Sequence, residues 1–287
     1  MIVGGAVPQA KEKPNECLFE TNKICTTPSY MRIMRNFLGK NNYDVFTLSD
    51  LDVVEVLKKE LGVFSESNIW ENERFKNYAG INDSTYVLNN YFKPEGPYNS
   101  TALLNNFNID ATLKQWKDHS DTLFKCKFYH VPFQMIDFAK TKTELATLDI
   151  YNVIKSGYNC LGVVLNTDVN TGRGKHWFCL FCDFKHSGSI DDPYTLEYFN
   201  SSGNPPMSEV EIWLQTNKHN MKKTYDKNCS IVRSASRRLQ HSQTECGVWS
   251  LMYIKSRLEN RGVNWFYKVR ADDRDMILLR KHLFRKS

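Results

Sequence analysis

Hydrophobic residues recur at helical spacing in two segments near the start of the chain, at residues 29–38 and 50–61, and a glycine follows each segment. Positions three and four apart share one side of a helix, and glycine commonly ends one. The pattern therefore predicts two helices in a small helical N-terminal region. The apolar positions are Met31, Met34, Phe37 and Leu38 in the first helix and Val53, Val54, Val56, Leu57 and Leu61 in the second.

The segment KPEGPYNS at residues 93–100 concentrates residues that favour turns. Proline and glycine continue neither a helix nor a central strand, so this composition indicates a linker. We place a domain boundary near residue 96, between an N-terminal helical arm domain (1–95) and a core domain (96–287). Residues 1–15, with two prolines and a Gly-Gly pair, are expected to form a flexible tail.

Beyond the boundary, helical and strand patterns mix. Helical patterns cover residues 110–117, 143–155 and 208–225, and strand patterns cover residues 160–165, 177–184, 195–199 and 230–233. Ser208 and Glu211 have the spacing of a reciprocal capping box at the start of the third helix. This mixture predicts an α+β core.

Composition is that of an ordinary folded protein. The 287 residues are 41% hydrophobic, 24% charged and 13% aromatic, which is enough for one core with a smaller accessory domain. No stretch approaches the length of a membrane span, and the N-terminus lacks the apolar centre of a signal peptide. The net charge of +6 is spread along the chain. It is compatible with weak, non-specific attraction to nucleic acid, but no recognition motif accompanies it.

Eight cysteines at irregular spacings, several inside apolar runs, indicate buried reduced thiols in place of a disulfide framework. Cys179-x-x-Cys182 has the spacing of a metal or redox pair. Residues three apart in a strand point to opposite faces, and no second pair has ligand spacing, so we expect buried strand cysteines and no metal or organic cofactor.

Cys246 is the candidate nucleophile. It stands at the start of a helical pattern, in the segment QHSQTECG at residues 240–247. Unpaired backbone N–H groups at a helix start favour the thiolate, which is the reactive form, so we expect the Cys246 thiol to ionise readily. A cysteine that only packs in a helix is the structural alternative.

His176 is the candidate general base among seven histidines. It follows the glycine-rich loop at residues 171–175 and precedes the apolar strand, where catalytic groups are often displayed. The base needs a third group to orient it, and Asn200 at the end of the next strand is the candidate. Asp183, Asp191 and Asp192 are chemically acceptable rivals.

The oxyanion that forms on the scissile carbonyl needs preorganised donors. The Cys246 backbone N–H and a side-chain amide would suit, and both Gln240 and Gln243 precede the nucleophile. Spacing alone does not choose between them.

The order His-Trp, then Asn, then Gln-x5-Cys-Gly resembles the SUMO-deconjugating and adenovirus-type cysteine proteases. A closer resemblance, covering most of the chain after residue 93, is to the polyprotein-processing protease of African swine fever virus, and the chain is identified as a homologue from another large double-stranded DNA virus. This resemblance is based on the segments GPYNSTALLNNFNIDATLKQW, VVLNTDVNTGRGKHW, LEYFNSSGNPP and QHSQTECG.

The resemblance implies a mixed sheet flanked by helices and a catalytic set of His176, Asn200 and Cys246. It places the oxyanion glutamine at Gln240, with Gln243 also matched, and puts Trp177 beside the substrate cleft. It further implies cleavage of viral structural polyproteins after Gly-Gly during virion maturation, in the host cytoplasm (the viral factory) and the virion. A cleft walled by Trp177 would select Gly-Gly by steric exclusion.

Gly4-Gly5-Ala6 has the form of such a site. The simpler interpretation is a flexible tail, and the sharper one is self-cleavage or binding in a neighbouring active site.

Two other functions compete with polyprotein processing. One is removal of ubiquitin-like or SUMO-like modifiers, whose tails also end in Gly-Gly. The other is a non-catalytic virion or nucleic-acid-binding scaffold, although a scaffold does not need the full Cys, His, Asn and Gln set.

Overall fold

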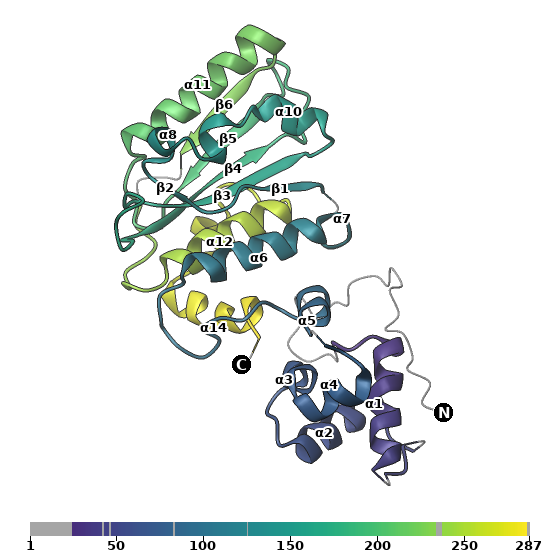
Figure 1. Ribbon diagram of the computed structural model, residues 1–287. Coiled ribbons are helices and arrows are strands. Elements are labelled where there is room, and N and C mark those ends of the chain that lie inside the picture. Colours follow the sequence, from purple (N-terminus) through teal and green to yellow (C-terminus); the bar gives the residue numbers. More distant parts are fainter. Residues whose placement is uncertain are drawn as a thin grey trace. The chain divides into compact units, whose positions relative to one another are not determined.

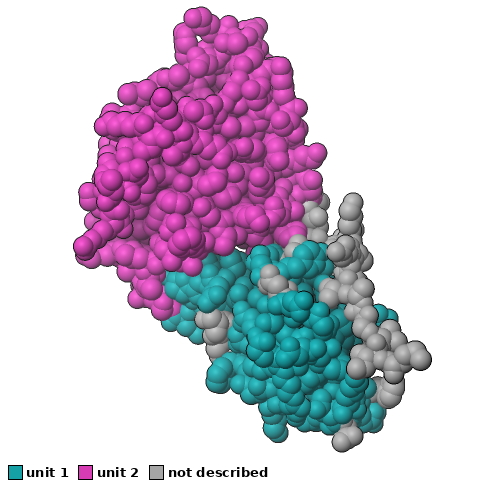
Figure 2. All heavy atoms as spheres, in the orientation of Figure 1, with its two compact units in different colours: residues 1–99, 280–287 teal, residues 100–279 magenta. Residues whose placement is uncertain are grey.

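The computed structural model describes residues 25–41, 43–45, 47–82, 84–124, 126–233 and 237–285. The predicted N-terminal tail and Gly4-Gly5-Ala6 lie outside the described residues. The chain divides into two compact units, residues 1–99 with 280–287 and residues 100–279 (Figure 2). The division after Asn99 lies close to the boundary predicted near residue 96. The last residues of the chain, placed in the core domain by sequence, group with the first unit.

The first unit is helical, as predicted. Its helices are α1 (Pro28–Lys40), α2 (Asp50–Leu61), α3 (Glu66–Glu71), α4 (Glu73–Ala79) and α5 (Thr85–Tyr91) (Figure 1). Helix α2 has the predicted bounds because Ser49 and Asp52 form a capping box at its start and Gly62 takes the left-handed conformation at its end, with φ of 66°. The buried apolar faces of these helices meet in one cluster around Met34, Leu57 and Trp70.

The second unit contains a mixed sheet in the order β1-β3-β4-β5-β6, with β2 also paired to β3. Strand β4 is antiparallel to both of its neighbours, β3 and β5, whereas β1, β2 and β6 join their neighbours in parallel. This confirms the predicted α+β class. The strands are β1 (Phe128–His130), β2 (Gln134–Met135), β3 (Cys160–Asn166), β4 (Trp177–Asp183), β5 (Tyr194–Phe199) and β6 (Cys229–Arg233).

Helices cover both faces of this sheet (Figure 1). On one face, alternate strand residues such as Leu180 pack with α10 and α11 in one core cluster. On the other face α12 lies against β3 and β4, and α6 lies beside β1. The helices of this part of the chain are α6 (Asn106–Asp118), α7 (Ser120–Leu123), α8 (Phe138–Thr141), α9 (Glu144–Thr147), α10 (Ile150–Lys155), α11 (Ser208–Tyr225), α12 (Cys246–Leu258), α13 (Trp265–Val269) and α14 (Asp273–Leu283).

Two local predictions are wrong. The helix expected at residues 143–155 is two short helices, α9 and α10, because Leu148 is extended and Asp149 begins a new helix by accepting from the Tyr151 N–H. Helix α11 has the predicted bounds but no capping box. The Glu211 carboxylate instead accepts a hydrogen bond from Arg233 Nε at 3.1 Å.

None of the helices in the described part of the chain combines the length and apolarity needed to cross a lipid bilayer.

Candidate active site

Cys246 is the first residue of α12, as predicted, and its side chain is 2% exposed. Burial raises the pKa of the Cys246 thiol, and the nearby Glu245 charge acts in the same direction. The backbone N–H groups of Trp177, Gly247 and Cys246 lower it, but by less. The helix start thus acts on the thiol pKa in the expected direction, but loss of hydration outweighs it and the net shift is the opposite of the one expected from sequence.

His176 lies directly before β4 and is half-buried. Its Nε2 is 2.8 Å from the Oδ1 of Asn200, which follows the neighbouring strand β5. Because the N–H of Trp177, the next residue, interacts with the Cys246 sulfur, the chain brings all three predicted catalytic residues to one place.

Hydrogen bonds around Asn200 determine which nitrogen of His176 carries the proton. The Ser202 backbone N–H, which can only donate, bonds to Asn200 Oδ1 at 3.0 Å, and the Asn200 amide donates to the Tyr198 hydroxyl at 3.0 Å. Asn200 Oδ1 is therefore an acceptor, and His176 Nε2 must donate to it. This leaves Nδ1 of a neutral His176 with a lone pair that can accept a proton.

Burial lowers the pKa of His176, and its hydrogen bond to Asn200 acts in the raising direction. Burial thus acts on both groups in the same sense: the lowered pKa of the imidazole and the raised pKa of the thiol each favour the neutral form.

The two candidate oxyanion glutamines have different surroundings. Gln240 is 4% exposed; its Oε1 accepts from the Ser201 hydroxyl at 2.7 Å, and its Nε2 donates to the Ser242 carbonyl at 2.8 Å. Ser201 is the residue after Asn200, so Gln240 is fixed beside the third catalytic candidate. Gln243 is exposed. The structure thus fixes one of the two amides and leaves the other at the surface.

The carboxylate rivals of Asn200 have other contacts. Asp183, at the far end of β4 from His176, is 3.2 Å from the Arg257 guanidinium. Asp192 is 2.7 Å from His186, and Asp191 is exposed. Asp183 and Asp192 are thus engaged with other side chains, whereas Asn200 contacts the His176 ring directly.

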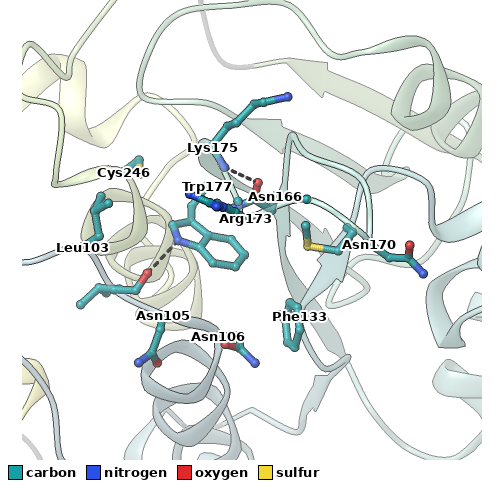
Figure 3. A pocket seen from close by; sticks show the side chains of 14 residues that line it. Leu103, Asn105, Asn106, Phe133, Asn166, Asn170, Arg173, Lys175, Trp177 and Cys246 are labelled. Carbon is teal, nitrogen blue, oxygen red and sulfur yellow. Dashed lines mark hydrogen bonds between the residues drawn. The ribbon is translucent and has the colours of Figure 1, made fainter.

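A cleft of about 480 Å³ opens beside Cys246 (Figure 3). The Trp177 indole forms one wall; its N–H donates to the Leu104 carbonyl at 2.9 Å, and its ring meets Phe133 edge to face. The lining residues are Leu103, Leu104, Asn105, Asn106, Phe133, Met135, Asn166, Asn170, Gly172, Arg173, Gly174, Lys175, Trp177 and Cys246.

The sequence analysis did not identify Leu104 and Phe133, the residues that contact Trp177 in this cleft. A Cβ added at Gly247 would lie 3.0 Å from Leu104 Cβ, so Gly247 makes room for Leu104 and thereby for the Trp177 contact. Leu104 and Phe133 carry no chemical group that signals a site. The turn-rich segment before residue 104 was the only hint that the chain lies across the core there.

Within the described residues, no three His, Cys, Asp or Glu side chains gather as a metal ion would require. Cys179 and Cys182 are both fully buried, and burial raises the pKa of each thiol. Cys182 packs in the cluster beneath α11, whereas Cys179 occupies the alternate register facing the other side of the sheet. These two thiols therefore point apart.

No family model matches the chain. Among known proteins, a "SUMO-1 cysteine protease" of African swine fever virus is 35% identical over 290 residues, covering 95% of this chain and 96% of that protein. The corresponding "Cysteine protease" of the Badajoz strain has the same identity and coverage. The crystal structure of the African swine fever virus protease matches with a TM-score of 0.75 and 32% identity, and covers 93% of both chains. The likeness extends well beyond the core segments on which the resemblance was first based.

Proposed function

The chain is a viral cysteine protease that belongs to the family of the African swine fever virus cysteine proteases, and we propose that it cleaves viral structural polyprotein precursors after Gly-Gly pairs during virion maturation. The observation that carries the catalytic assignment is the 2.8 Å hydrogen bond between His176 and Asn200 beside the buried Cys246 thiol.

In the proposed mechanism, His176 Nδ1 takes the proton from Cys246 as the sulfur attacks the scissile carbonyl carbon. The C=O electron pair moves to oxygen and then re-forms the carbonyl as the C–N bond breaks. Protonated His176 gives its proton to the departing amine, leaving a thioester on Cys246. Water, deprotonated by His176, then hydrolyses the thioester and restores the thiol. Asn200 keeps the ring oriented throughout through Nε2.

Gln240 is the side-chain donor that we assign to the oxyanion, together with the Cys246 backbone N–H. Its amide is buried and held at both ends, so no ordering is required when the oxyanion forms. One amide hydrogen of Gln240 bonds to the Ser242 carbonyl, and the second remains to be donated. Loss of one such donor typically costs about 100- to 1,000-fold in kcat.

Selectivity for Gly-Gly follows from the wall of the cleft next to Cys246. Trp177 is fixed by Leu104 on one side and Phe133 on another, so the indole cannot easily swing away. A side chain larger than hydrogen at the two positions before the cleaved bond would meet this ring. The cleft thus rejects substituted residues by steric exclusion.

A peptide panel tests this assignment. Peptides containing Gly-Gly-Ala, Gly-Ala-Ala and Ala-Gly-Ala are incubated with the full chain and cleavage is mapped by mass spectrometry. Only the first should be cut, after the second glycine, and Cys246→Ala should abolish cleavage. Equal cleavage of all three would remove the proposed specificity, and activity in Cys246→Ala would remove the proposed nucleophile.

Removal of a SUMO-like modifier is the second candidate, because a relative carries the name "SUMO-1 cysteine protease". A SUMO–fluorophore conjugate run beside the peptides separates the two functions. Turnover of the conjugate alone would favour deconjugation over polyprotein processing. A purely non-catalytic scaffold is not consistent with membership of this family of proteases.

We further propose that the enzyme acts in the host cytoplasm, at the viral factory, and is packaged in the virion. The buried free thiols and the thiol nucleophile suit a reducing compartment. Immunoblots of cytoplasmic fractions and purified virions from infected cells test this location. Absence from both would contradict it.

A further inference from the structure

The charge of the substrate cleft is one-sided. Among the described residues that line it, Arg173 and Lys175 are cationic and none is acidic. The Lys175 ammonium lies 3.1 Å from the carboxylate of the buried Asp168. The charge of Lys175 is therefore largely matched within the protein. Within the described part of the chain, the exposed Arg173 guanidinium has no hydrogen bond or ion pair.

The backbone of the loop that carries Arg173 is held by hydrogen bonds to two buried side chains, Asn166 and Asp168. Asn166 Oδ1 accepts the backbone N–H groups of Asp168 and Lys175, at 3.0 and 2.9 Å. The Asp168 carboxylate accepts the N–H groups of Val169 and Gly174, at 3.0 and 3.2 Å. The backbone on both sides of Arg173 is therefore hydrogen-bonded to these two side chains.

Glycines flank Arg173 on both sides, and the structure requires each of them. A Cβ at Gly172 would lie 2.3 Å from the Asp168 carboxyl group, and Gly174 has φ of +85°. The backbone on either side of Arg173 is thus fixed, and only its side chain remains free to move. A cation presented on a rigid backbone at the rim of a cleft loses less entropy on binding an anion than one on a mobile loop.

The cleft also has room beyond the Gly-Gly pair. Its volume of about 480 Å³ is that of a typical ligand site and exceeds what two residues without side chains fill. Figure 3 shows the lining continuing from Cys246 past Trp177 to Phe133 and Asn170. If Gly-Gly lies against Trp177, as the proposed function requires, this further space takes the residues upstream of the pair.

We propose that Arg173 is a specificity-determining residue that pairs with a carboxylate of the substrate, an Asp or Glu side chain upstream of Gly-Gly. This inference rests on the proposed function, because the Gly-Gly pair fixes the direction of the chain in the cleft. A guanidinium and a carboxylate form paired hydrogen bonds, so an acidic residue is preferred over its neutral amide as well as over a basic residue.

The test is a Glu/Gln scan of the four positions upstream of Gly-Gly-Ala, measured as kcat/KM at low salt. At one position the wild-type enzyme should prefer Glu over Gln by about fivefold, the size expected of a partly exposed ion pair. The preference should shrink as salt screens the pair. Arg173→Gln should bring the ratio close to one, Arg173→Lys should retain part of it, and Arg173→Glu should favour Lys at that position.

Arg274→Gln is the matched control, because Arg274 is a highly exposed arginine that does not line the cleft and pairs only weakly with Asp272, at 3.6 Å. It should keep the wild-type ratio. Equal turnover of Glu and Gln peptides by the wild-type enzyme at every position would overturn the inference, as would a Glu preference that survives in Arg173→Gln. If either result is obtained while cleavage still requires Gly-Gly, the proposed function stands. Cleavage that does not depend on Gly-Gly would count against that function itself.

Discussion

Replacing Glu197 with glutamine would break the buried ionic cluster that joins α12 to the sheet. Glu197 is completely buried in β5. Its carboxylate accepts hydrogen bonds from the Tyr253 hydroxyl at 2.9 Å and from Arg257 Nε at 2.8 Å and Nη2 at 2.9 Å. Burial acts to lower the pKa of Arg257, but the hydrogen bonds and charge of Glu197 outweigh it and the pKa is raised. Each charge in this cluster therefore depends on the other.

The expected cost follows from that dependence. Removing one partner of a buried ion pair leaves the other charge uncompensated, and this typically costs about 3–5 kcal/mol. Asp183, 3.2 Å from Arg257, remains as a second anion, so we expect the lower end, about 3 kcal/mol, for Glu197→Gln. At about 2–4 °C per kcal/mol for a unit of this size, the midpoint of thermal unfolding should fall by about 6–12 °C.

Differential scanning calorimetry of the full chain measures this shift. Glu211→Gln is the matched control, since Glu211 and Arg233 form an ion pair with side chains 34% and 40% exposed, for which less than about 1 kcal/mol is expected. In the double variant Glu197→Gln, Arg257→Met the uncompensated charge is removed and much of the loss should be recovered. If Glu197→Gln changed the midpoint no more than Glu211→Gln, the argument from buried charge would be refuted.

Three further predictions concern the catalytic residues and the loop before His176. Because burial lowers the pKa of His176 from 6.5, its base form persists as the pH falls, so the acid limb of kcat/KM should lie below pH 6.5; a limb at or above that value would contradict a buried neutral imidazole. Asn200→Ala removes the acceptor of His176 Nε2 and a contribution that raises the His176 pKa, so kcat should fall by up to about 100-fold and the acid limb should move lower still; an unchanged pH profile would argue against this contact. Gly172→Ala should raise KM and lower stability because its Cβ would collide with the Asp168 carboxyl group, whereas Gly62→Ala, at φ of +66° with open space around it, should cost only about 1 kcal/mol and leave KM unchanged.

Long periodic segments were predictable from sequence, and short ones were not. Helices α2 and α11 begin and end, and α12 begins, where the apolar spacing places them, because each has enough turns for one face to repeat. Strands β1 and β2 contain three and two residues, too few to show alternation. Their place in the sheet is determined by pairing with β3, and the local sequence does not predict this pairing.

The catalytic candidates were predictable where their roles depend on residue type and on position at the end of a strand or helix. His176 and Asn200 could be paired because each stands at an end of a neighbouring antiparallel strand, β4 and β5. The direction of the Cys246 pKa shift was not predictable, because the sequence shows the helix start but not the burial that outweighs it. Leu104 and Phe133 were missed because they shape the cleft through a backbone carbonyl and an aromatic contact, neither of which the sequence marks as part of a site.

The end of β5 links the parts of this site that lie far apart in sequence. Within the segment from Glu197 to Ser201, Glu197 binds the helix that begins with Cys246, Asn200 orients His176, and Ser201 holds Gln240 by its hydroxyl and its carbonyl. Since side chains alternate along a strand, a shift of one residue in the pairing of β5 would turn Glu197 away from α12 and displace Asn200 together with it. The register of this strand therefore sets the position of the nucleophile, the base and the oxyanion donor at once.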